Sequence, residues 1–176
     1  MFPQRLKKIA LGLSVLLPFL IYCVIYYSEI FKDTSYRFSD FQSFSYQYGT
    51  GDSLINKYDS KTGNYQYLNN HDSLIKKHFY LTNAELMQLH FKAAYWGFWD
   101  FPDREVNDSA KARGVNSPHY LIQFNFKNKS KKVLYDAAFD GPPKLKDANE
   151  GMKAAIEEIL NEAEKNEAQR EALLKK

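Results

Sequence analysis

The sequence predicts an α+β protein, with an N-terminal transmembrane helix followed by an antiparallel sheet that has two helices packed on one face. Several short segments alternate apolar and polar residues between turn residues, which is typical of strands. Two longer segments repeat apolar residues every three or four positions, as helices do. An uncharged apolar run near the N-terminus is long enough for a membrane span. The 176 residues then divide into a cytoplasmic stub with its anchor (1–32), a tether (33–42) and one extracytoplasmic α+β domain (43–176).

The membrane span is predicted over residues 9–27, which carry no charged side chain. At a rise of about 1.5 Å per residue this run would be ~28 Å long, close to the ~30 Å thickness of a bilayer's hydrocarbon core. Three basic residues precede it, whereas Lys32 on the other side is offset by Glu29 and Asp33. By the positive-inside rule, the N-terminus faces the cytoplasm and the main domain lies outside.

Two alternatives concern how this segment is processed. Residues 9–27 could belong to a cleaved signal peptide, although no small-residue cleavage site of the A-x-A type follows them. Cys23 could carry a lipid, although the bulky Tyr22 stands where a lipidated cysteine is preceded by a small residue. Cys23 is the only cysteine, so an intramolecular disulfide is excluded and packing alone holds the outer domain.

Strands are predicted in two groups. The first comprises 44–48, 54–58, 64–68 and 74–81, separated by turns. A turn that ends in Gly63 joins its second and third members, which predicts a β-hairpin. The second group comprises 120–126 and 132–137 around the lysine-rich turn 127–131, and its alternation predicts an antiparallel hairpin with one buried face.

Two helices are predicted, each with a marked apolar face. Thr82 and Glu85 have the spacing of a capping box before the first helix, which ends at Gly97. The inward-facing residues of this helix are Leu86, Leu89, His90 and Ala93, flanked by Met87, Phe91 and Ala94. The second helix starts at about Ala148, and its apolar face is formed by Met152, Ile156, Ile159, Leu160 and Ala163.

The order of these elements, together with the phrases KTGNYQY, LTNAEL and YWGFWDF, resembles a group of small α+β domains of unknown function. These domains follow signal peptides or anchors in bacterial envelope proteins. The likeness covers roughly residues 43–160. It implies the fold class and an envelope location, and it carries no catalytic residue over to this chain.

The predicted binding site follows the first helix. Phe98, Trp99 and Phe101 form a dense aromatic cluster, and rings this close in sequence are expected to leave one of them exposed for recognition. The polar segment behind them is long for a loop in a compact domain, which is typical of functional or disordered loops. Asp103 and Glu105 in this segment complete the set of binding residues. The alternative is that the rings only fill the core where helix meets sheet.

No metal or cofactor site is predicted. The four histidines, His71, His78, His90 and His119, show none of the spacings that place two ligands on one face. The acidic stretch 100–108 lacks the pattern of a calcium loop. From Asp33 onward 20 acidic residues balance 20 basic ones, which excludes nucleic-acid binding through bulk electrostatics.

These observations predict a membrane-anchored extracytoplasmic module, held by residues 9–27, that binds an unknown envelope protein or small ligand without catalysis. The alternative is an envelope hydrolase whose site is assembled from dispersed groups: His78, His119 and the carboxylates of 100–108. A further alternative is a subunit of a larger envelope assembly that docks through its C-terminal helix. A pocket lined by two or more of the dispersed polar groups would favour the hydrolase.

Overall fold

The computed structural model describes residues 14, 16–24, 36–51, 53–107 and 117–174. The chain divides into two compact units, Met1–Arg37 and Phe38–Lys176. Residues 16–24 of the first unit are helical. No helix in the described ranges is both long enough and apolar enough to cross a membrane. Much of the span predicted over 9–27 lies outside the described residues, so this span stays a prediction.

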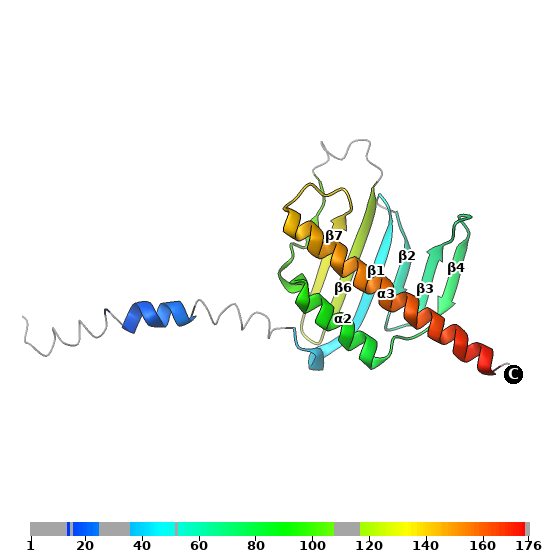
Figure 1. The fold of residues 1–176 in the computed structure, drawn as a ribbon, viewed down its shortest axis with the longest axis horizontal. Coiled ribbons are helices and arrows are strands. Elements are labelled where there is room, and N and C mark those ends of the chain that lie inside the picture. Colours follow the sequence, from blue (N-terminus) through cyan, green and yellow to red (C-terminus); the bar gives the residue numbers. More distant parts are fainter. Residues whose placement is uncertain (1–13, 15, 25–35, 52, 108–116, 175–176) are drawn as a thin grey trace, which may run out of the picture. The chain divides into compact units, whose positions relative to one another are not determined.

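The second unit is α+β, as the sequence predicts (Figure 1). Its elements in chain order are η1 (Phe38–Asp40), β1 (Phe41–Thr50), β2 (Ser53–Asp59), β3 (Asn64–Leu68), β4 (Leu74–His78), α2 (Asn83–Tyr95), η2 (Phe98–Asp100), β5 (Arg104–Glu105), β6 (Pro118–Phe126), β7 (Ser130–Asp136) and α3 (Pro143–Leu174). The last five residues of the predicted tether, 38–42, thus form η1 and the start of β1.

The strands form one sheet in the order β4-β3-β2-β1-β6-β7-β5. Both predicted hairpins are present, β2–β3 and β6–β7, and β1 lies between them. The expectation of a purely antiparallel sheet is wrong at one edge, where the two-residue β5 pairs with β7 in parallel. The sheet is therefore mixed, because the chain reaches β5 from α2 on the helical side and not from a hairpin.

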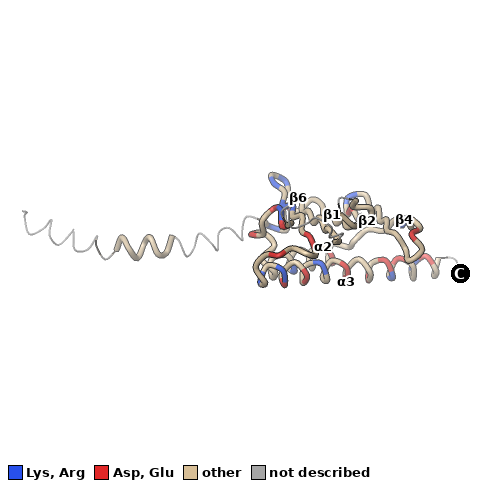
Figure 2. Tube along the Cα trace, turned by 90° about the horizontal axis from the view of Figure 1, so that it is seen from above, with Lys and Arg blue, Asp and Glu red and all other residues tan. Residues whose placement is uncertain are grey.

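Both helices cover the same face of the sheet (Figure 1). Leu89 and Ala93 of α2 are fully buried, which confirms the predicted phase of this helix. The predicted inward face of α3 is buried as well: Met152, Ile156, Ile159, Leu160 and Ala163. Acidic and basic residues are interspersed along α3, whose outer side is exposed (Figure 2).

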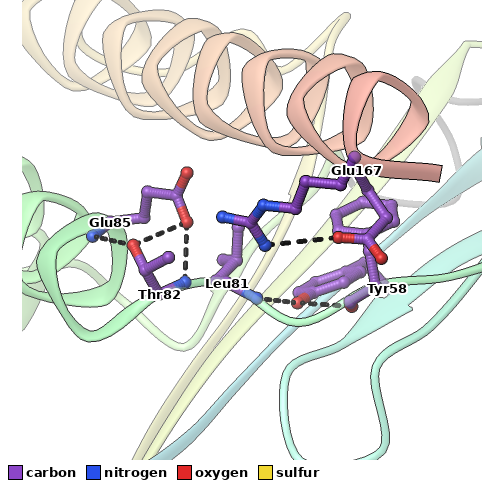
Figure 3. A network of polar contacts seen from close by, with 7 residues as sticks. Tyr58, Leu81, Thr82, Glu85 and Glu167 are labelled. Carbon is purple, nitrogen blue, oxygen red and sulfur yellow. Dashed lines mark hydrogen bonds and ion pairs between the residues drawn. The ribbon is translucent and has the colours of Figure 1, made fainter. Parts of the chain in front are cut away.

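The start of α2 has the capping box that the sequence predicts (Figure 3). The Thr82 Oγ1 accepts a hydrogen bond from the Glu85 N–H at 3.3 Å, and the Glu85 carboxylate accepts one from the Thr82 N–H at 2.6 Å. Gly97 follows the helix with a φ of 73°, the left-handed conformation that glycine adopts most readily. Local sequence thus determines both ends of α2.

Helix α3 begins at Pro143, earlier than predicted, because proline is well suited to the first turn of a helix. It crosses the whole sheet. Near its start, the Asn149 side chain donates a hydrogen bond to Glu105 of the edge strand β5. Further along, Glu164 forms an ion pair with Lys77 of the opposite edge strand β4. One helix therefore joins the two edges of the sheet.

Candidate functional site

The three aromatic residues of the predicted binding site lie in the core. Phe98, Trp99 and Phe101 are 0%, 7% and 6% exposed. The ring centroids of Phe98 and Trp99 lie 5.4 and 5.2 Å from that of Phe124 on β6. The expectation that one of these rings is exposed is therefore wrong, because the turn of η2 directs all three inward. A binding role for this segment depends on its polar residues.

The two polar residues of the predicted binding site, Asp103 and Glu105, face in different directions. Asp103 is exposed and forms an ion pair with Lys131 at 2.9 Å. Glu105 is completely buried and accepts a hydrogen bond from the Asn149 side chain. Burial raises the pKa of the Glu105 carboxyl above its usual range, although the bond from Asn149 and the charge of Lys131 partly oppose this rise. Asp103 and Glu105 do not form a common site.

The surroundings of Glu105 form a small buried polar cluster. Three of its atoms have no hydrogen-bond partner within the part of the chain that the structure describes: Glu105 Oε1, Asn149 Oδ1 and the Tyr135 hydroxyl. A cavity of about 40 Å³ is lined by Tyr135 and Asn149, among others. A volume of this size has room for an ordered water molecule but not for an organic ligand. The cluster is thus a structural feature of the core.

The residues of the hydrolase alternative do not converge. His119 lies 3.6 Å from the Asp136 carboxylate, which also accepts a hydrogen bond from the Ser117 hydroxyl. In this arrangement the Ser117 hydroxyl donates to the carboxylate, whereas in a serine–histidine–aspartate triad the serine hydroxyl is hydrogen-bonded to the histidine. His78 is on β4, with three strands between it and His119 on β6, which corresponds to about 19 Å. The acidic residue at 108 lies outside the described residues.

The open face of the sheet, opposite the helices, is hollowed over β1–β4. We call this hollow of about 580 Å³ the sheet groove. Its polar lining consists of Ser45, Gln47, Lys57, Asp59, Thr62, Asn64, Gln66, Lys76 and Lys77, with contributions from Tyr58 and Tyr65. Phe44 and Tyr46 point into the core, so the alternating residues of β1 point into the groove.

The strand register arranges these side chains in two rows across four strands. The first row runs from Gln47 to Lys57, Gln66 and Lys76, each paired with the next. The second row runs in the same way from Ser45 to Asp59, Asn64 and His78. Neighbours in a row are about 4.8 Å apart, and the rows are separated by about 7 Å along the strands. The groove thus presents a regular grid of polar groups.

Part of this grid is held in place and part is free. The Asp59 carboxylate accepts hydrogen bonds from the backbone N–H groups of Lys61 and Thr62 at 2.8 and 3.2 Å. Within the described ranges, the side chains of Gln47, Lys57 and Lys76 form no hydrogen bond or ion pair. Their donors are available to a ligand. Sequence reasoning missed the groove because alternating polar residues in a strand also indicate an ordinary solvated face.

A second surface is apolar and lies on α2. Met87, Phe91 and Tyr95 are 42%, 63% and 78% exposed. They recur every four residues and therefore lie along one side of the helix, which we call the α2 stripe. The sequence indicates Met87 and Phe91 only as flanks of the buried face. Exposed apolar patches of this kind are typical of interaction surfaces.

No protein family model, no curated protein and no solved structure matches this chain. The resemblance to envelope domains of unknown function therefore stays a prediction, and the function has to be inferred from the geometry of the two surfaces.

Proposed function

We propose that this chain is a membrane-anchored, extracytoplasmic binding module without catalytic activity, and that the sheet groove holds its ligand. The observation that carries this proposal is the pair of polar rows across β1–β4. Hydrogen-bonding side chains converge there on an open hollow, while the other face of the sheet is covered by helices. The uncharged run 9–27, with basic residues before it, supports the anchor and its orientation.

The lining of the groove defines the chemical class of the ligand. Lys57 and Lys76 lie in the first row, and their ammonium groups have no ion-pair partner among the described residues. Asp59, which carries the opposite charge, lies in the second row. Ammonium groups bind carboxylates or other anions, and amide and hydroxyl side chains bind hydroxyl groups. The open shape suits an extended molecule and does not enclose a compact one. The ligand is an extended, hydroxyl-rich acidic polymer, such as an oligosaccharide that carries carboxylates.

Calorimetry on the full chain in detergent tests this proposal. The probes are oligogalacturonate, which is acidic, and a malto-oligosaccharide of equal length, which is neutral. We expect oligogalacturonate to bind more tightly, and the double variant Lys57→Glu/Lys76→Glu to weaken this binding at least about tenfold, because charge-assisted hydrogen bonds contribute ~1.5–3 kcal/mol each. A matched control, Lys144→Glu/Lys165→Glu, changes the net charge equally on exposed sites of α3. Absence of binding, or equal losses in both variants, would contradict the proposal.

A protease experiment tests the location independently. Protease added to intact cells or spheroplasts is expected to degrade the folded unit and to spare a tag on Met1. The opposite pattern of protection would show that the orientation is reversed.

A further inference from the structure

We propose that the α2 stripe, together with the basic β6–β7 turn, docks the folded unit onto the anionic surface of the membrane in which residues 9–27 are anchored. This inference rests on the proposed membrane anchor. It assigns the exposed aromatic side chains of α2, which neither the core nor the groove uses, to the lipid–water interface.

The α2 stripe points away from the rest of the helical layer. At 100° per residue, Trp96 lies between about 100° and 180° around the helix axis from the three members of the stripe. Trp96 packs against α3, where its ring occupies the space that a side chain at Gly151 would fill. Leu89 and Ala93 point into the core. The remaining side of α2, which carries the stripe, is exposed.

The folded unit begins next to α2. The ring centroid of Phe38, at the start of η1, lies 5.6 Å from that of His90 on α2. The His90 ring is in turn 6.3 Å from Phe91 of the stripe. Between the predicted anchor and Phe38 lie residues 28–37, which even fully extended reach at most about 36 Å. The length of this connection limits how far Phe38 can lie from the end of the predicted span.

Basic side chains gather at the same end. The backbone N–H of Lys127 in the β6–β7 turn donates to the Asp40 carbonyl oxygen of η1 at 2.9 Å. The Lys127 ammonium also lies 3.3 Å from the Asp40 carboxylate. Lys129 is close enough to Asp40 for the two charges to interact. Two cations, Lys127 and Lys129, thus lie near one acidic group, Asp40, beside the start of the folded unit.

This combination favours a membrane over a protein partner or a second copy. Aromatic residues prefer the interfacial layer of a bilayer, and lysines near it are attracted by anionic lipids. A short connection to an anchor in the same membrane keeps the stripe at a high effective concentration beside the lipid. The groove lies on the other face of the sheet from α2, so docking leaves it accessible to its ligand.

Fluorescence quenching by lipids tests the docking on the full chain reconstituted in vesicles. One set of vesicles contains phosphatidylglycerol and phosphatidylcholine in equal amounts, and the other contains phosphatidylcholine alone. A bimane label is attached at Gln88→Cys, an exposed position on α2, in a chain that also carries Cys23→Ser. Nitroxide lipids in the bilayer quench the label where α2 is docked. We expect several-fold stronger quenching in the anionic vesicles.

Matched variants give the proposal its controls. Met87→Ser/Phe91→Ser/Tyr95→Ser changes only exposed side chains and is expected to reduce quenching several-fold. Leu173→Ser/Leu174→Ser removes equally exposed apolar side chains from the end of α3 and should leave quenching unchanged. Quenching that is absent, or unaffected by the stripe variant, would overturn the proposal. Energy transfer between labelled chains without lipid quenching would show that a second copy covers the stripe, and would overturn it too.

Flotation of the same vesicles separates this inference from the proposed function. A chain that fails to float with the vesicles refutes the membrane anchor itself. A chain that floats with unquenched label refutes the docking alone. Binding of oligogalacturonate to the same vesicles reports on the groove independently of both.

Discussion

Replacing Gly151 with alanine is expected to destabilise the folded unit, although this substitution stabilises most helices. In a helix interior, glycine is less favourable than alanine by about 0.5–1 kcal/mol. Gly151 lies within α3 where the helix passes Trp96. A Cβ atom at this position would lie 2.7 Å from Trp96 Cη2 and closer still to two other ring atoms. Contacts below 3 Å essentially never occur at real Cβ atoms.

The gain in helix propensity and the clash with Trp96 have opposite effects on the free energy of unfolding, and the larger effect sets the sign of the change. Overpacking a tight contact costs about 1–3 kcal/mol, because the ring or the helix has to shift. Subtracting the helix-propensity gain leaves a net loss of about 0–2.5 kcal/mol in the free energy of unfolding. In a domain of this size, each 1 kcal/mol corresponds to a change in Tm of about 3–5 °C.

Thermal unfolding of the full chain in detergent, followed by circular dichroism, measures this loss. Ala154→Gly at an exposed site of the same helix is the control, and it should cost about 0.5–1 kcal/mol from helix propensity alone. In a Trp96→Leu background, Gly151→Ala should become stabilising, because the clash is gone. A higher Tm for Gly151→Ala in the otherwise unchanged chain would refute the packing argument.

Three further predictions concern single side chains. Leu89→Asp should unfold the domain, because Leu89 is fully buried and an unpaired carboxylate there costs several kcal/mol. Lys129→Asp at the hairpin tip should change the free energy of unfolding by under about 0.5 kcal/mol. Equal Tm values for the two variants would contradict this prediction. Burial raises the pKa of Glu105, so in the folded state this carboxyl keeps its proton to higher pH than in the unfolded chain. The stability of the fold should therefore fall as pH rises through the raised pKa. Glu105→Gln should remove this fall, which is measured as Tm between about pH 4 and 8. Thr82→Ala should cost about 1 kcal/mol by removing the helix cap, while Thr82→Ser should cost little, both measured by denaturant titration.

Much of the fold could be predicted because its signals are local. The capping box at Thr82, the stop at Gly97 and the alternation in β1 and β6 each lie within a few residues. Strand β5 could not be predicted, because two residues cannot show a period. Its parallel pairing with β7 depends on how the chain returns from α2, which is a property of the assembled fold.

The surfaces were harder to predict than the fold. Glu105 was expected in a polar loop, since carboxylates are seldom fully buried, yet it packs against Asn149 from a helix far along the chain. The rows of the groove depend on the register between strands, which no single strand contains. The members of the α2 stripe recur every four residues, so the sequence alone could have shown that α2 has a second apolar side. A helix that packs one side into the core cannot bury both sides.

The bridging of both sheet edges by α3 has a consequence during translation. All seven strands are synthesised before α3, and until that helix has emerged only α2 covers part of their apolar side. The ribosome needs about 2–8 s for the residues between the end of β7 at Asp136 and the end of α3 at Leu174, and the growing chain is prone to aggregation or misfolding for that time. Pairs such as Tyr46 with Glu157, 111 residues apart, form only afterwards. The folded unit therefore cannot complete its folding in order from its N-terminus. Its solubility in the cell depends on how well the incompletely covered sheet is protected until α3 has emerged.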